Sequence, residues 1–100
     1  MVTAIIEVKV TPEAKFGYRC VAKTIGEFRE VESVYLTSGS YDLILIVNCA
    51  DMRGVSNFVS TKLSTIEGVN GTVTNFIMER YKQCGEIFDI EEDERELGTI

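Results

Sequence analysis

The segment from Leu43 to Val47 is the strongest constraint on how this chain can fold, because its five consecutive residues are all aliphatic. Side chains alternate between the two faces of a strand, so a strand of this kind is covered on both faces. We expect helices of the same domain to cover one face. A chain of 100 residues with two predicted helices has nothing left for the other face, so we expect a partner chain there.

The apolar pattern predicts a strand, a helix, two strands, a second helix and a fourth strand. Alternating or β-branched apolar residues place the strands at residues 2–10, 31–37, 41–49 and 72–78. This order is typical of the α+β, ferredoxin-like βαββαβ fold. Right-handed crossovers then give a four-stranded antiparallel sheet with both helices on one face and the first and third strands in the centre.

Capping residues mark the expected helix ends. Thr11 and Pro12 predict the start of the first helix, whose apolar face continues to Phe28 and which would contain Gly17 in its interior. Asp51 is a suitable N-cap for the second helix, and Gly68 is a suitable end.

The charge of the chain is unevenly distributed. The chain has 16 acidic and 10 basic residues and a net charge of −6, but residues 1–85 hold nine of each sign. We therefore expect one neutral domain over residues 1–85 and an acidic tail over residues 86–100. Within the tail, residues 86–90 can form a short strand, and we expect the rest to be disordered.

Several function classes find no support in the residues. No aliphatic run approaches the ~20 residues of a membrane helix, and the N-terminus lacks the basic start of a signal peptide. The chain has no His, and its three Cys are too widely spaced for a CxxC pair, so we expect no metal, no cofactor and a reducing cytoplasmic location. A body without a basic stripe gives no support for direct nucleic-acid binding.

The turn over Ser38, Gly39 and Ser40 is the most informative candidate site, because Asp42 follows it directly before the aliphatic run. Two interpretations are open. Asp42 can satisfy backbone amides of an ordinary hairpin turn. It can instead face the ammonium of a zwitterion whose carboxylate meets the N–H groups of the loop.

The motif Gly39-Ser40-Tyr41-Asp42, followed by Asp51-Met52, Ile66-Glu67-Gly68-Val69-Asn70 and Thr72-Val73-Thr74, resembles the effector domain of the Lrp/AsnC transcription regulators. The resemblance runs from about residue 31 to residue 83. It implies a homodimer paired through the sheets, assembly into octamers or larger rings, and a free amino acid bound between dimers. By position it implies effector contacts at Ser38, Gly39, Tyr41 and Asp42, with Thr72, Thr74 and Phe76 as further candidates. The β propensity of an edge strand explains the two threonines equally well.

Most members of that family carry an N-terminal helix-turn-helix domain, whereas this sequence opens on the effector domain. The resemblance is therefore to the stand-alone form, also called the RAM domain. Such a domain would not contact DNA itself and would regulate by joining full-length relatives. Two alternatives are a purely structural interaction module with a vestigial pocket and a cofactor-free dimeric α+β-barrel enzyme. The absence of His and Trp disfavours the enzyme.

Overall fold

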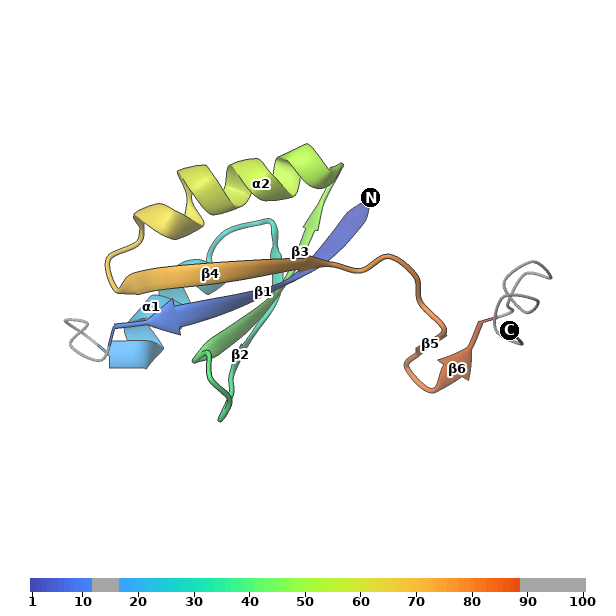
Figure 1. Cartoon of the computed structure of the whole chain (residues 1–100), viewed down its shortest axis with the longest axis horizontal. Coiled ribbons are helices and arrows are strands. Elements are labelled where there is room, and N and C mark those ends of the chain that lie inside the picture. The colour runs from blue at the N-terminus through green and yellow to red at the C-terminus, as the bar shows by residue number, and fades with distance from the viewer. Residues whose placement is uncertain (12–16, 89–100) are drawn as a thin grey trace.

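The computed structural model describes residues 1–11 and 17–88, and a four-stranded antiparallel sheet forms its centre (Figure 1). The strands follow the order β2-β3-β1-β4, with β1 and β3 in the middle. This confirms the predicted ferredoxin-like fold. The elements are β1 (Val2–Val10), α1 (Gly17–Gly26), β2 (Val31–Leu36), β3 (Leu43–Cys49), α2 (Met52–Thr61), the 3₁₀ turn η1 (Leu63–Thr65), β4 (Val69–Phe76), β5 (Lys82–Gln83) and β6 (Glu86–Ile87).

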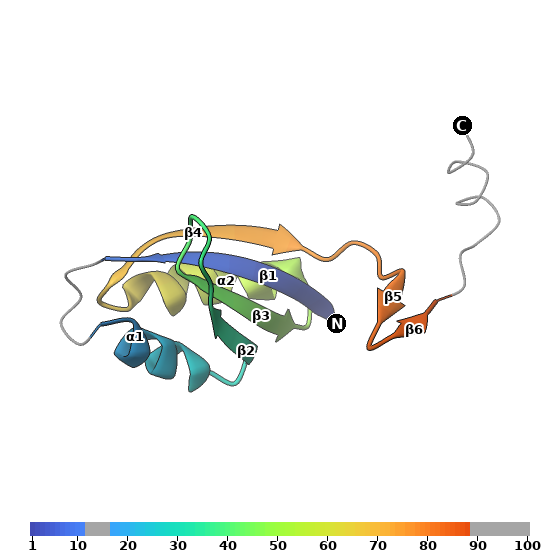
Figure 2. The same cartoon turned by 90° about the horizontal axis from the view of Figure 1, so that it is seen from below.

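Both helices lie on one side of the sheet, as Figure 2 shows. Alternate residues of β1 and β3 point toward them and are almost fully buried, because the strand period puts every second side chain on that face. The buried core consists of Ala4, Ile6, Val8, Val10, Val21, Ile25, Leu43, Leu45, Val47, Val55, Phe58 and Leu63. We call this side of the sheet the covered face.

The other side of the sheet, which we call the open face, is not covered by any helix among the described residues. The strand register assigns to it Thr3, Ile5, Glu7, Lys9, Ser33, Tyr35, Ile44, Ile46, Asn48, Val73 and Asn75. Tyr35 is 56% exposed and Val73 is 37% exposed. The two-sided aliphatic strand predicted from Leu43–Val47 is therefore covered on one side within this chain.

The first helix differs from its prediction. α1 begins at Gly17, which has a positive φ of 76°, so Gly17 stands at the helix boundary and not in the interior. The predicted cap at Thr11–Pro12 falls largely outside the described residues. Phe28 follows the helix but still packs inward, with its ring edge-on to that of Phe58 at 5.6 Å between centroids.

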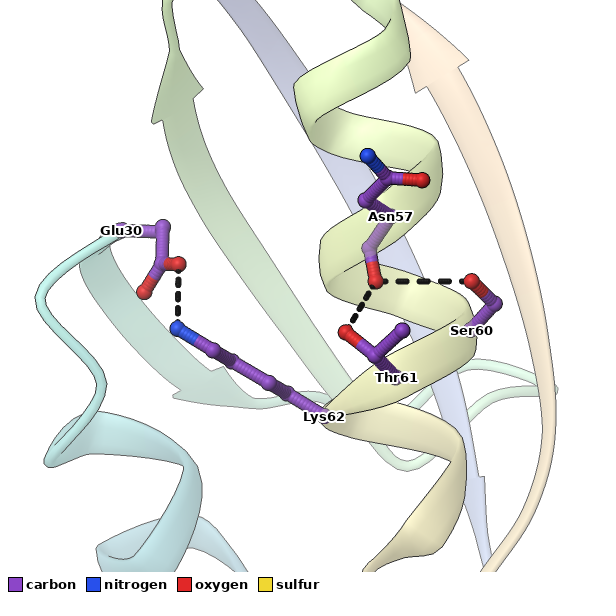
Figure 3. Close-up of polar contacts among 5 residues, drawn as sticks. All are labelled: Glu30, Asn57, Ser60, Thr61 and Lys62. Atoms are coloured by element: carbon purple, nitrogen blue, oxygen red, sulfur yellow. Dashed lines mark hydrogen bonds and ion pairs between the residues drawn. The ribbon is translucent and has the colours of Figure 1, made fainter.

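The second helix begins where predicted, since the Asp51 carboxylate accepts a hydrogen bond from the Gly54 amide at 2.8 Å. At its other end the Thr61 hydroxyl donates to the Asn57 carbonyl at 2.6 Å, which closes the last turn (Figure 3). Neither α1 nor α2, at ten residues each, is long enough to cross a membrane, and no other described helix is longer.

An ion pair ties the end of α2 to the segment that leads into β2. Lys62 Nζ lies 2.7 Å from Glu30 Oε2 (Figure 3). The same ammonium also lies above the Phe28 ring. The hydrogen bond from Lys62 is the main reason why the pKa of Glu30 lies below its ordinary value, with burial acting in the opposite direction.

The C-terminal arm, residues 77–88, extends beyond the end of β4 and away from the body (Figures 1 and 2). Its strands β5 and β6 form a small hairpin of their own, whose turn residues Cys84 and Gly85 both have positive φ, as a type I′ turn requires. The predicted boundary after residue 85 falls in this turn, and β6 overlaps the predicted strand at 86–90. The rest of the predicted acidic tail lies outside the described residues.

Candidate functional site

The turn between β2 and β3 is closed by two hydrogen bonds at its base. Thr37 N donates to the Asp42 carbonyl at 2.9 Å, and the Thr37 hydroxyl donates to the Tyr41 carbonyl at 2.9 Å. The three residues at the tip, Ser38, Gly39 and Ser40, are exposed. Figure 2 shows the turn rising on the side of the sheet opposite α1. The structure therefore presents a fixed frame with an accessible tip.

Asp42 is bonded to the central strand. Its Oδ2 accepts from Val10 N at 2.8 Å, and its own N–H donates to the Val8 carbonyl at 3.0 Å. Both bonds lie just past Val8–Leu43, the last registered pair of β1 with β3. Because β3 has ended there and offers Val10 N no carbonyl, the Asp42 carboxylate accepts its hydrogen bond instead. Asp42 therefore satisfies a backbone amide, as one interpretation predicted, but the amide belongs to β1 and not to the hairpin turn itself. Its contact with a ligand ammonium stays a prediction.

Lys9 belongs to the same site, although the sequence did not single it out. Its Nζ donates to the Ser40 carbonyl at 3.0 Å, so an ammonium stands beside the tip of the turn. Lys9 lies on the open face with Ile5 and Glu7, and the strand alternation of β1 is the signal that could have placed it there. The turn therefore carries both an acid and a base, which suits a zwitterion.

The further candidates on β4 lie on the covered face. Thr72, Thr74 and Phe76 stand opposite Val8, Ile6 and Ala4, whose side chains face the helices. β1 separates β4 from β3, which is the strand that the turn leads into. Phe76 lies four residues, or ~13 Å, along the strand from Thr72 and packs against the core. The structure therefore brings Ser38 to Asp42 together and does not bring Phe76 to them.

Two hollows adjoin these elements and were not predicted. Thr72 borders a cavity of about 140 Å³ that it shares with Ser64, Asn70 and Gly71. A larger and mostly apolar groove of about 440 Å³ lies between α1 and β2, with Arg19 and Lys23 among the residues that line it. The first lies between η1 and β4 and the second mainly between α1 and β2, and sequence periodicity does not report how these elements pack against one another.

Cys49, at the end of β3, is a half-buried thiol. Burial raises its pKa above the ordinary value, and the nearby Glu30 and Asp51 carboxylates act in the same direction. Within residues 1–11 and 17–88, no group of three or more His, Cys, Asp or Glu side chains is placed to hold a metal ion.

Comparison with known proteins agrees with this architecture. The family model described as the Lrp/AsnC ligand binding domain matches residues 3–87. The HTH-type transcriptional regulator YugG of Bacillus subtilis is 47% identical over 96 residues, which are 96% of this chain and 58% of YugG. The HTH-type transcriptional regulator FL11 of Pyrococcus horikoshii is 29% identical over 70 residues, or 70% of this chain and 46% of FL11. The chain thus spans about half the length of the curated relatives that it matches.

Solved structures of similar domains superpose closely. TTHA0845 from Thermus thermophilus has a TM-score of 0.74 at 25% identity and covers 83% of this chain and 100% of its own. The transcriptional regulator NMB0573 of Neisseria meningitidis, solved as a complex with L-Met, has a TM-score of 0.77 at 26% identity, over 86% of this chain and 55% of its own. With a family model that covers residues 3–87 and a relative at 47% identity, this chain belongs to the Lrp/AsnC family as a ligand-binding domain.

Proposed function

We propose that this chain is an amino-acid-responsive regulatory domain that binds a free amino acid at the turn of residues 38–42 and assembles through its open face. The observation that carries the proposal is the pairing of Asp42 and Lys9 around an exposed glycine-containing tip. One acid, one base and free backbone N–H groups are the partners that an ammonium and a carboxylate need.

The similar proteins support the assignment to a ligand-binding regulatory domain. The family model is a ligand-binding domain, and the similar regulator from Neisseria meningitidis was solved with L-Met. Because the curated relatives are transcription regulators, an enzymatic role has no support among them. No described feature favours the cofactor-free enzyme alternative.

The open face supports assembly. Ile5, Ile44 and Ile46 form an aliphatic centre on adjacent strands, since Ile5 stands opposite Ile46 in the register of β1 with β3. A second copy that presents the same face would cover all three residues in an isologous dimer. We propose further pairing of such dimers into octamers or larger rings, and mixed assembly with full-length relatives, as the route to regulation in the cytoplasm.

The structural-module alternative rests on one specific observation. Asp42 already accepts a hydrogen bond from Val10 N, so its carboxylate stabilises the fold even when no ligand is bound. The experiment must therefore separate loss of binding from loss of this bond.

Asp42→Asn makes that separation, because an amide oxygen can still accept from Val10 N while the negative charge is gone. Asp51→Asn is the matched control, since Asp51 also uses one carboxylate oxygen to accept a backbone N–H at 2.8 Å, at the start of α2. A thermal-shift panel of the common L-amino acids is run on both variants and on the unaltered chain, beside light scattering for assembly size.

An amino acid at ten times its dissociation constant should add ~1.4 kcal/mol per site and raise the melting temperature by several degrees. We expect Asp42→Asn to abolish this rise and Asp51→Asn to retain it. A melt that no amino acid changes at millimolar concentration would leave the structural module as the function.

A further inference from the structure

The groove of about 440 Å³ between α1 and β2 lies on the covered side of the sheet, but the described residues do not fill it. Its apolar lining comes from Tyr18, Ala22, Val34, Leu36 and Leu43, of which Tyr18 and Leu36 are exposed. β2 is an edge strand, so no further strand among the described residues closes the groove on that side. The groove therefore offers apolar area to a segment from elsewhere.

The charged residues that line the groove are both basic. Arg19 and Lys23 are exposed and stand four residues apart on α1, so their side chains share one face of the helix. Like charges at this spacing destabilise a helix, and an anion beside them removes that cost. Within residues 1–11 and 17–88 the only ion pair joins Glu30 and Lys62, so no described carboxylate meets either base. The groove thus combines an apolar lining with two uncompensated positive charges.

The sequence that follows the C-terminal arm has the complementary character. Residues 89–100 contain six acidic residues and one basic residue, and five of the six acids fall within residues 91–96. Two aliphatic residues, Ile90 and Leu97, flank this acidic run. The acids can meet Arg19 and Lys23 while the aliphatic residues pack on the apolar lining, so the acidic tail and the groove are complementary in charge and in polarity.

The reach of the tail favours the groove of a second copy. The C-terminal arm and α1 lie at opposite ends of the molecule in both views, and the long axis measures 52 Å (Figures 1 and 2). The acidic run ends eight residues after Phe88, so it extends at most ~29 Å from the end of the arm. This length falls well short of the opposite end of the same chain, whereas a neighbouring copy can bring its tail to the groove from outside.

We propose that the acidic tail of one copy, residues 89–100, docks on the groove between α1 and β2 of a second copy. Arg19 and Lys23 bind carboxylates of residues 91–96, and Ile90 and Leu97 pack on the apolar lining. The contact lies on the covered side, so it depends neither on the open-face dimer nor on an amino acid at the turn. Because it joins two different surfaces, tail and groove, it can link dimers that are already paired isologously.

Zero-length cross-linking of the intact chain tests the contact. Equal amounts of unlabelled and ¹⁵N-labelled chain are unfolded together in urea, refolded together and treated with a water-soluble carbodiimide, which joins an amine to a carboxylate that touches it. Mass spectrometry identifies the joined peptides. We expect Lys23 to be joined to residues 91–96, with mixed and unmixed isotope pairs equally abundant. The Lys62–Glu30 pair, 2.7 Å apart within one chain, is the control and should give only unmixed products.

Two changes should lower the yield of the Lys23 product. Arg19→Glu should lower it at least about fivefold, because a like charge then faces the acidic run. Arg53→Glu makes the same change at an exposed position of α2 and should leave the yield unchanged. Raising the ionic strength to about 1 M, where the screening length is ~3 Å, should also lower the yield.

Three results would overturn the proposal. Unmixed products alone at Lys23 would place the tail on its own chain. An equal yield from Arg19→Glu and from the unaltered chain would remove the groove as the partner of the tail. The absence of any product that joins Lys23 to residues 91–96, in a sample where Lys62 and Glu30 are joined, would show that the tail does not reach the groove.

Discussion

The two faces of the sheet are made by the same strands and differ in what covers them. On the covered face, Ile6 and Leu45 are completely buried beneath the helices. On the open face, their chain neighbours Ile5, Ile44 and Ile46 are only half-buried, and Tyr35 is 56% exposed. Ile5 and Ile6 are neighbouring isoleucines in the same strand, yet Ile6 is completely buried and Ile5 is only half-buried. The difference teaches that the covered face holds the single chain together, whereas the open face has apolar area left for association.

The largest effect is expected from shortening a side chain on the covered face. Ile6→Ala removes buried methyl groups and leaves a cavity that the helices cannot fill, so it should lower the free energy of unfolding by ~2–5 kcal/mol. Ile5→Ala, one residue earlier, should cost less than half as much for the single chain. Urea titration at low protein concentration measures both, and equal losses would erase the distinction between the faces.

Dimer formation should be weakened by a charged substitution on the open face and not by one on the covered side. Ile44→Lys puts a charge in the centre of the open face beside Tyr35 and Glu7, so a dimer that forms there should weaken by ~100-fold or more. Analytical ultracentrifugation measures the dissociation constant, and circular dichroism checks that the fold is kept. Leu36→Lys is the control, because Leu36 is 67% exposed but belongs to the covered side of β2. If both variants associate alike, the open face is not the interface.

The rate of thiol labelling at Cys49 reports how well the packing of α2 on the end of β3 protects this side chain from solvent. Cys49 is half-buried against α2, where a Cβ at Gly54 would lie 3.1 Å from that of Cys49, whereas Cys20 and Cys84 are exposed. Because burial also raises the Cys49 pKa, we expect this thiol to react with iodoacetamide about tenfold more slowly than the other two at neutral pH. Mass spectrometry of the labelled peptides gives the three rates. Equal rates would show that the end of β3 opens readily.

The smallest expected effect concerns the Glu30–Lys62 pair at the edge of the covered layer. The pKa of Glu30 is lowered in the fold, so its contribution is present above the ordinary value of 4.5 and is lost as the pH falls through the folded-state pKa. The side chains are 21% and 42% exposed, which limits the contribution to below about 1 kcal/mol. Between pH 7 and pH 3 the unaltered chain should therefore lose slightly more stability than Glu30→Gln. An identical pH dependence of the two urea midpoints would contradict this role for the pair.

The fold could be predicted from the sequence because most of it depends on local periodicity. Alternation in Val2–Val10 and the aliphatic run at Leu43–Val47 identified both central strands, and Asp51 marked the start of α2 correctly. The boundary of α1 could not be predicted, since the positive φ of Gly17 leaves no trace in a hydrophobic pattern. Of the β5–β6 hairpin only β6 was predicted, within residues 86–90, and β5 was missed because a strand of two residues has no period to detect.

The candidate site was predictable only in part, for a different reason. Ser38 to Asp42 are contiguous, so the sequence itself brings them together. The contact between Lys9 and Ser40 joins residues 31 positions apart, and only the register of β1 with its neighbours reveals it. The same register puts Phe76 opposite Ala4, at the far end of the sheet from the turn.

The hydrogen bonds around the turn of residues 38–42 also have an entropic consequence. Thr37 closes the base of the turn, Asp42 anchors it to β1, and Lys9 holds the Ser40 carbonyl, all before any ligand arrives. A molecule that binds the tip therefore meets backbone that is already ordered. Most of the conformational freedom of this loop is lost during folding and not during binding, so even a small ligand with few contacts can retain most of its interaction energy as affinity.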